Sequence, residues 1–156
     1  MARLERLLER RPELLNSVQL RQNPHDVHAW HDRAKIFHAD PARQAATYAE
    51  AVRTVDPTKA TGKPPHTLWL AFAKLYETRG LLDSAREVFR RATQVSFRSV
   101  DDLATVWCEW AEMELRHGNR EAAIELIRQA TSEPSVEVRT RVAAADQPAV
   151  QIKLHR

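Results

Sequence analysis

Cys108 is the only cysteine in the sequence, and it lies in the stretch VWCEWAEMEL, which is rich in carboxylates. A thiolate nucleophile needs a nearby base and an environment that stabilises its negative charge. No histidine lies within one helical turn of Cys108, and Glu109 and Glu112 should raise the pKa of the thiol. We therefore predict an ordinary helical cysteine without a catalytic or redox role.

Three histidines, His25, His28 and His31, follow one another at intervals of three residues, with Asp32 beside the last. Two imidazoles one turn apart can bind zinc. On a helix, however, this spacing rotates each histidine by about 60° from the one before it. The sequence also contains no HExxH motif. We predict a polar helix start beside Trp30, with neither a metal nor a cofactor.

Acidic residues in the last third of the chain invite an acid–base interpretation: Glu109, Glu112, Glu114, Glu121 and Glu125. They alternate at helical spacings with Arg116, Arg120 and Arg128, as charges on a solvated helix face do. The sequence has no Gly-rich phosphate loop and no GxSxG motif. We predict that these acids are solvated surface, and that the chain is not an enzyme and has no small-molecule substrate.

Basic residues raise a different question, because a stack of helices could align several of them and attract phosphate. The candidates for RNA contact are Arg90, Arg91, Arg98, Arg139 and Arg141. The net charge is only +3, and strongly basic nucleic-acid binders usually show a clustered patch. Single-strand binders also expose aromatic rings for base stacking, whereas the aromatic residues here follow a core pattern. We therefore rank RNA contact second to protein binding.

The elements that position these residues are predicted to be helices. The chain has 156 residues, enough for about one domain, with 43% hydrophobic residues, 29% charged residues and only three glycines. No apolar run approaches the roughly 20 residues that a membrane helix needs, so we expect no membrane partner. A single cysteine fits a reducing, intracellular compartment.

A repeat organises these helices. Trp30, Trp69 and Trp107 recur at an interval of about 40 residues, and an alanine follows one helical turn after each: Ala34, Ala73 and Ala111. A second helix carries a small position (Gln44, Ala85, Ala123), a larger apolar position (Tyr48, Phe89, Ile127) and a last alanine (Ala51, Ala92, Ala130). Three copies at this period predict an all-α array of antiparallel helix pairs.

Turn residues agree with this period. Gly80 and Gly118 are separated by the same interval as Trp69 and Trp107, and should end the first helix of their pairs in a left-handed conformation. In the first copy, Asp40–Pro41 should make the corresponding turn. We expect helix N-terminal caps at Asn23–Pro24, at Thr67, and at Ser99 with Asp102.

The pattern resembles the half-a-TPR (HAT) repeat, whose first helix carries a Trp and a second aromatic three residues later. Trp69 with Phe72 and Trp107 with Trp110 match this pair, and AREVFRRAT (85–93) resembles the second-helix motif. The first copy departs, because Arg33 replaces the second aromatic and Gln44 replaces the small residue. We expect that copy to pack more loosely or against a different neighbour.

Longer strings such as HTLWLAFAKLYE and VDDLATVWCEWAEMELRHGN resemble the Syf-type pre-mRNA splicing scaffolds, known in animals as XPA-binding HAT proteins. The resemblance covers nearly the whole chain, and this family is several times longer, so we expect a segment of a longer solenoid. It implies a nuclear protein of the NineTeen-associated splicing complex that binds other splicing proteins. It also implies a link to transcription-coupled DNA repair.

We predict a partial preceding repeat over 1–22 and full repeats over 23–56, 66–97 and 99–132. A linker and the start of another repeat should follow over 133–156. The predicted function is a protein-binding scaffold for splicing-complex proteins. The alternatives are an RNA-contacting module and an architectural spacer whose partner sites lie elsewhere.

Overall fold

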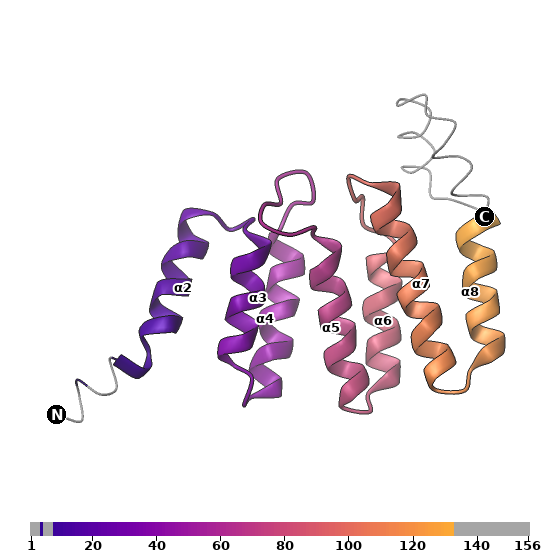
Figure 1. The fold of residues 1–156 in the computed structure, drawn as a ribbon, viewed down its shortest axis with the longest axis horizontal. Helices are drawn as coiled ribbons and strands as arrows, with labels where there is room; N and C mark the ends of the chain where they lie inside the picture. Colours follow the sequence, from indigo (N-terminus) through magenta and orange to yellow (C-terminus); the bar gives the residue numbers. More distant parts are fainter. Residues whose placement is uncertain (1–3, 5–7, 133–156) are drawn as a thin grey trace. The chain divides into compact units, whose positions relative to one another are not determined.

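A computed structural model of the chain describes residues 4 and 8–132, so the predictions for 133–156, including Arg139 and Arg141, fall outside it. The described residues form helices and no β-strand, which confirms the all-α prediction. The helices labelled in Figure 1 are α2 (Arg11–Gln22), α3 (Val27–Ile36), α4 (Pro41–Thr54), α5 (His66–Thr78), α6 (Leu82–Ala92), α7 (Val100–Arg116) and α8 (Arg120–Ser132). None of these helices is long and apolar enough to cross a membrane.

The chain divides into two compact units, Met1–Leu75 and Tyr76–Arg156. In the first unit, α3 packs against both α2 and α4. Val27, Trp30 and Ala51 are buried there, together with Leu68 from the start of α5. The indole of Trp30 donates a hydrogen bond from Nε1 to the carbonyl oxygen of Pro24 (2.9 Å). This bond lets the largest side chain of the core be buried without an unpaired donor.

Two helix caps predicted from the sequence, at Asn23–Pro24 and at Thr67, are not formed. Asp26 caps α3, since its carboxylate accepts a hydrogen bond from the backbone N–H of Ala29 (3.1 Å). Asn23 instead accepts from the N–H of His25 (3.1 Å), and its amide Nδ2 donates to the hydroxyl of Thr61 (3.0 Å). Both predictions at Asn23–Pro24 and Thr67 were therefore wrong. Asn23 makes a turn that precedes the helix, and Thr67 lies inside α5.

The cap predicted at Ser99 is confirmed, and Asp40, which was predicted only to make a turn with Pro41, also caps a helix. The Asp40 carboxylate accepts from the N–H of Arg43 (3.2 Å), with Pro41 at the first helical position of α4. The Ser99 hydroxyl accepts from the N–H of Asp101 (3.2 Å) at the start of α7. These short side chains satisfy donors that the first helical turn leaves free.

In the second unit, α7 packs against α6 and α8, and the predicted glycine turns are confirmed. Gly80 has φ 76° and Gly118 has φ 79°, in the left-handed region. The N–H of Leu81 donates to the carbonyl of Tyr76 (2.9 Å) after α5, and the N–H of Asn119 donates to that of Glu114 (2.8 Å) after α7. Both helices thus end in the same Schellman turn, which favours a residue without a Cβ at the left-handed position.

The repeat positions divide by burial. Most are buried: Trp30, Ala34, Ala51, Trp69, Phe72, Ala73, Ala85, Phe89, Ala92, Ala111 and Ala123. Five are half-buried: Gln44, Tyr48, Trp107, Trp110 and Ala130. Ile127 is exposed, so its place in the core pattern was wrong for the described residues. Buried alanines let neighbouring helices approach closely, and the larger rings fill the space between them.

Arg33 and Gln44, the two residues at which the first copy departs from the HAT pattern, both make polar contacts. The Arg33 guanidinium donates from Nη1 to the Asn16 amide oxygen and to the Ser17 hydroxyl, each at 3.2 Å, so it faces α2. Asn16 is buried and donates its own amide to the carbonyl of Ala29 (2.8 Å). The Gln44 amide donates to the carbonyl of Ala34 (2.9 Å). Hydrogen bonds to α2 and α3 thus occupy the places that aromatic and small residues hold in the other copies.

Candidate protein-binding groove

A groove of about 410 Å³ lies between α7 and α8 in the second unit. Its floor is formed by Ala111 and Ala123, both buried, because two facing alanines allow the helices to approach. Its sides carry Leu115, Ile124 and Ile127, with exposed fractions of 54%, 48% and 41%. Three large aliphatic side chains this exposed on one surface are typical of a binding site.

Polar residues complete the lining of this α7–α8 groove: Cys108, Glu112 and Arg120. Cys108 is exposed. Its thiol pKa is raised by partial burial and by the nearby carboxylates of Glu112 and Glu109, as predicted. A raised pKa keeps the thiol protonated near neutral pH, which makes it a poor nucleophile.

Beside the groove, α7 carries an aromatic stack, whose residues Trp107 and Trp110 also pack against the buried Ala111, Ala123 and Leu126. The ring of Trp110 lies parallel to that of Phe89 from α6, with centroids 5.9 Å apart, and to that of Trp107 at 5.9 Å. The indole Nε1 of Trp110 is buried without a hydrogen-bond partner among the described residues. The stack therefore fixes α7 against α6 through ring contacts alone.

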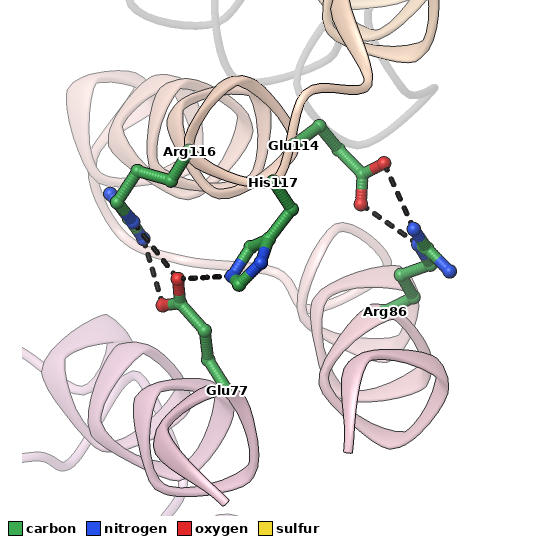
Figure 2. Close-up of polar contacts among 5 residues, drawn as sticks. All are labelled: Glu77, Arg86, Glu114, Arg116 and His117. Atoms are coloured by element: carbon green, nitrogen blue, oxygen red, sulfur yellow. Dashed lines mark hydrogen bonds and ion pairs between the residues drawn. The ribbon is translucent and has the colours of Figure 1, made fainter. Parts of the chain in front are cut away.

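An ion pair between Arg86 and Glu114 also joins α6 to α7 (Figure 2). The Arg86 guanidinium donates from Nε and Nη2 to the two carboxylate oxygens of Glu114, at 2.8 and 3.3 Å. The Glu114 side chain is 4% exposed and that of Arg86 is 31% exposed. The hydrogen bond with Glu114 raises the pKa of Arg86 above its ordinary value. The prediction that Glu114 belongs to a solvated face was wrong, because Arg86 compensates the charge that burial would otherwise destabilise.

A second ion pair joins the last turn of α5 to the end of α7 (Figure 2). The carboxylate of Glu77 accepts two hydrogen bonds from Arg116, at 2.8 and 2.9 Å, and one contact from Nε2 of His117 at 2.9 Å. The Glu77 side chain is largely buried, and the hydrogen bond with it raises the pKa of Arg116. The two ion pairs, Glu77–Arg116 and Arg86–Glu114, hold α7 on the elements that precede it.

The other predicted acids lie toward solvent. Glu112, Glu121 and Glu125 are exposed and Glu109 is half-buried. Glu125 lies 3.4 Å from Arg128 on the same helix. The alternation of charges on α8 is therefore that of a solvated face, as the sequence predicted.

The three histidines have three different partners. His25 accepts from the N–H of Asp56 (3.0 Å), His28 lies 3.4 Å from Asp32, and Nε2 of His31 lies 3.0 Å from the hydroxyl of Thr67. Burial, with Lys63 and Lys35 nearby, lowers the pKa of His31 to about 4. In the part of the chain that the structure describes, no three side chains of ligand type are placed to hold a metal.

The arginines considered for RNA contact that the structure describes are Arg90, Arg91 and Arg98, and all three are exposed. Arg90 is paired with Glu87 one turn earlier on α6. Arg91 adjoins it, and Arg98 lies in the connection before α7. The acid beside Arg90 reduces the local positive potential that would attract a phosphate backbone.

Sequence reasoning missed the exposed aliphatic residues of the α7–α8 groove, although a signal was present. Leu115, Ile124 and Ile127 lie one repeat period, the interval from Trp69 to Trp107, after Glu77, Arg86 and Phe89. Comparing equivalent positions therefore shows two charged residues replaced by aliphatic ones in the last described helix pair. Only the contacts of Glu77 and Arg86 with α7 show that the equivalent positions of the preceding pair lie at a helix–helix interface.

Comparisons with known proteins agree with the repeat pattern. The profile for the Syf1/CRNKL1 C-terminal HAT repeat of pre-mRNA-splicing factors matches residues 57–156, and the SYF1 middle HAT repeat profile matches 1–55. The chain is 58% identical to pre-mRNA-splicing factor SYF1 of Rattus norvegicus over 135 residues, 86% of this chain. It is 51% identical over its whole length to the syf1 homolog of Drosophila melanogaster, and 38% identical to cwf3 of Schizosaccharomyces pombe. It spans 16%, 17% and 19% of these relatives, respectively.

Proposed function

Because the chain belongs to the Syf1 family of HAT-repeat pre-mRNA-splicing factors, we propose that it is a protein-binding scaffold segment acting in pre-mRNA splicing. The proposal includes a nuclear location and partners among splicing-complex proteins. The chain spans under a fifth of the length of these relatives. The proposal therefore concerns only what this segment contributes to splicing.

The observation that carries this proposal is the exposed apolar surface of the α7–α8 groove. Leu115, Ile124 and Ile127 present aliphatic surface on a helical framework that Trp110 and the Glu114–Arg86 pair hold in place. A preformed apolar groove between two helices favours the binding of an amphipathic helix, because apolar area is buried at little cost in ordering the receptor.

We propose no catalytic role for the segment. Cys108 has a raised thiol pKa, and the buried carboxylate of Glu114 is fully engaged with Arg86. Neither group is prepared for nucleophilic or acid–base chemistry.

RNA contact through Arg90, Arg91 and Arg98 is the second candidate, and the exposure of these three side chains is what favours it. It predicts binding that weakens steeply with salt, since neutralised phosphates release counterions. The Arg90→Glu with Arg91→Glu variant should then abolish it. Salt-independent or undetectable RNA binding would refute this candidate.

The test of the scaffold proposal is affinity capture of the chain from nuclear extract, with and without RNase. We expect splicing-complex proteins to be retained after RNase and to be lost with Ile124→Asp. Gln129→Asp is the matched control, because it adds the same charge at another exposed position of α8 and should leave capture unchanged. Loss of all partners on RNase treatment would favour RNA contact. A chain that captures nothing under either condition would be a spacer with partner sites elsewhere. Capture that Ile124→Asp leaves unchanged would place the binding surface on a part of the chain other than the α7–α8 groove.

A further inference from the structure

A pocket of about 260 Å³ lies in the first unit, among α2, α3 and α4. We call it the α2–α4 pocket, because Ser17 lines it from α2 and Thr54 lines it from α4. The buried residues Trp30 and Leu20 form its floor. All of its lining residues belong to the first unit, so this pocket is separate from the α7–α8 groove.

Arg33 of α3 also lines the α2–α4 pocket, and one part of its guanidinium is already fixed. Its Nη1 donates to the Asn16 amide oxygen and to the Ser17 hydroxyl, each at 3.2 Å. Asn16 is held in turn by its bond to the carbonyl of Ala29, and the guanidinium carbon lies 5.5 Å from the centre of the Phe37 ring. All of these neighbours are uncharged. The half-buried positive charge of Arg33 therefore has no carboxylate partner among the described residues.

The other edge of the Arg33 guanidinium, Nε and Nη2, makes no hydrogen bond with the described residues. Elsewhere in the chain this edge of an arginine is the one that binds a carboxylate (Figure 2). Arg86 uses Nε and Nη2 for Glu114, and Arg116 uses the same two atoms for Glu77. Such an edge matches the two oxygens of a carboxylate in geometry as well as in charge.

Most of the other polar groups in the α2–α4 pocket are hydrogen-bond donors. Arg21 adds a second guanidinium, and the hydroxyls of Ser17 and Thr54 donate to no acceptor in the part of the chain that the structure describes. Glu50 is the one acidic side chain of this lining. Arg21 and Glu50 are both exposed and form no ion pair within the described ranges. A ligand for this set must supply acceptors, and a single negative charge suits it better than several, because Glu50 repels a polyanion.

We propose that the α2–α4 pocket binds a glutamate side chain of a partner protein, with the carboxylate on the free edge of Arg33 and the methylene groups packed on Trp30 and Leu20. The carboxylate compensates a half-buried charge that the described fold leaves unpaired. An RNA backbone is a poorer ligand, because its successive phosphates would be repelled by Glu50. This inference extends the proposed scaffold function to a second site, in the other unit of the chain.

The experiment titrates the isotopically labelled full chain with N-acetyl-glutamate N-methylamide, the simplest peptide-like glutamate, and follows its N–H resonances by NMR. We expect saturable shifts at Nε of Arg33, at the indole of Trp30 and at the amide of Ser17. N-acetyl-glutamine N-methylamide is the matched control ligand, since it has nearly the same shape without the charge. It should bind at least about tenfold more weakly, because the charge-assisted hydrogen bonds are lost.

Variants of the chain locate the binding site. Arg33→Gln should weaken glutamate binding at least about tenfold, and so should Arg33→Lys, because an ammonium group lacks the planar edge that pairs with a carboxylate. Arg53→Gln is the matched control, at an exposed arginine of α4 that does not line the pocket, and it should leave the affinity unchanged.

Glu50→Gln should act in the opposite direction and tighten binding about twofold or more, since it removes the charge that repels the ligand. Glu50 is exposed, so this variant keeps the fold, and its result does not depend on the stability of the Arg33 variants.

Four outcomes overturn the proposal. The first is that the glutamate ligand causes no saturable shift at Arg33 and Trp30, and the second is that the glutamine ligand binds as tightly. The third is that Arg33→Gln and Glu50→Gln both bind like the parent. The fourth is that a short oligouridylate shifts the same resonances at lower concentration than the glutamate ligand, which assigns the pocket to RNA.

These results are distinguishable from a failure of the proposed function. If the α2–α4 pocket binds no glutamate while splicing proteins are still captured from extract and lost with Ile124→Asp, the scaffold proposal stands and this inference falls. Glutamate binding that depends on Arg33, without capture of splicing proteins, would show the reverse.

Discussion

The ion pair between Arg86 and Glu114 provides the sharpest test of how the second unit is held together. Charge alternation along the sequence predicts that Glu114 is a surface group, so that neutralising it should change stability by less than about 0.5 kcal/mol. The structure instead places the Glu114 carboxylate at 4% exposure with two hydrogen bonds to Arg86. The variants to compare are Arg86→Met, Glu114→Leu and the double variant, each close in size to the parent residue.

The two single variants should differ in magnitude. Arg86→Met leaves a buried carboxylate without its partner, which should cost about 3 kcal/mol of the free energy of unfolding. Glu114→Leu should cost only about 1–2 kcal/mol, because Arg86 is 31% exposed, can be hydrated, and keeps its contact with Asp83 at 2.9 Å. The double variant should cost about as much as Glu114→Leu alone, since no unpaired charge remains buried.

Urea denaturation of the full chain, followed by circular dichroism at neutral pH, measures all four free energies. The coupling energy between Arg86 and Glu114 should be about 3 kcal/mol, the cost of Arg86→Met that the double variant avoids, at the upper end of the range found for residues of one ion-pair network. Asp83→Ala is the control, because its side chain is 99% exposed and its pair with Arg86 should contribute little. Equal costs for the two single variants, or strict additivity in the double variant, would refute the reasoning from burial.

Three further predictions concern caps, turns and pH. Gly118→Ala should cost about 1 kcal/mol in urea denaturation, because φ is 79° and no neighbouring atom lies within 4 Å of the added Cβ; a loss much larger than this would point to a clash. Asp26→Ala should lower stability by about 1 kcal/mol through loss of the α3 cap, whereas Asn23→Ala should leave that cap intact; equal amide exchange at Ala29 in both variants would contradict the assignment. The pKa of His31 is lowered to about 4 from an unfolded value of about 6.5, so the unfolded chain binds more protons between these values. Neutral His31 therefore makes its full contribution to the free energy of unfolding above about pH 6.5, and this contribution declines as pH falls toward 4. The His31→Gln variant should have a flatter dependence of stability on pH in that window. An unchanged dependence would argue against the lowered pKa.

The repeat was readable from the sequence because its signals are local. Trp69 with Ala73, and Trp107 with Ala111, lie one turn apart, so their spacing alone predicts one apolar side of a helix. Gly80 and Gly118 mark the left-handed residue that ends such a helix. Asp40 before Pro41 likewise marks a helix start, and the structure has each of these features.

The sequence does not predict which hydrogen-bond partner each polar side chain takes. Asn23 and Asp26 are both good capping residues, but the Asn23 amide donates to the hydroxyl of Thr61, far away in the sequence, while Asp26 caps α3. Arg33 could have been predicted to lie on the surface, yet it contacts Asn16 and Ser17 because α2 packs there. In both cases the energy difference comes from groups that become neighbours only after the helices pack.

The sequence by itself therefore determined the helices, their period and the turns between them, since backbone propensity and apolar spacing act within a few residues. Only the tertiary structure decided that Glu114 is buried with Arg86 while Leu115 and Ile124 remain exposed. The free energy of a charge or an aliphatic chain depends on what covers it, and that is set by helices far apart in the sequence. Equivalent surface positions of successive helix pairs can therefore differ in charge and burial, and only the packed structure shows which of them lie at an interface.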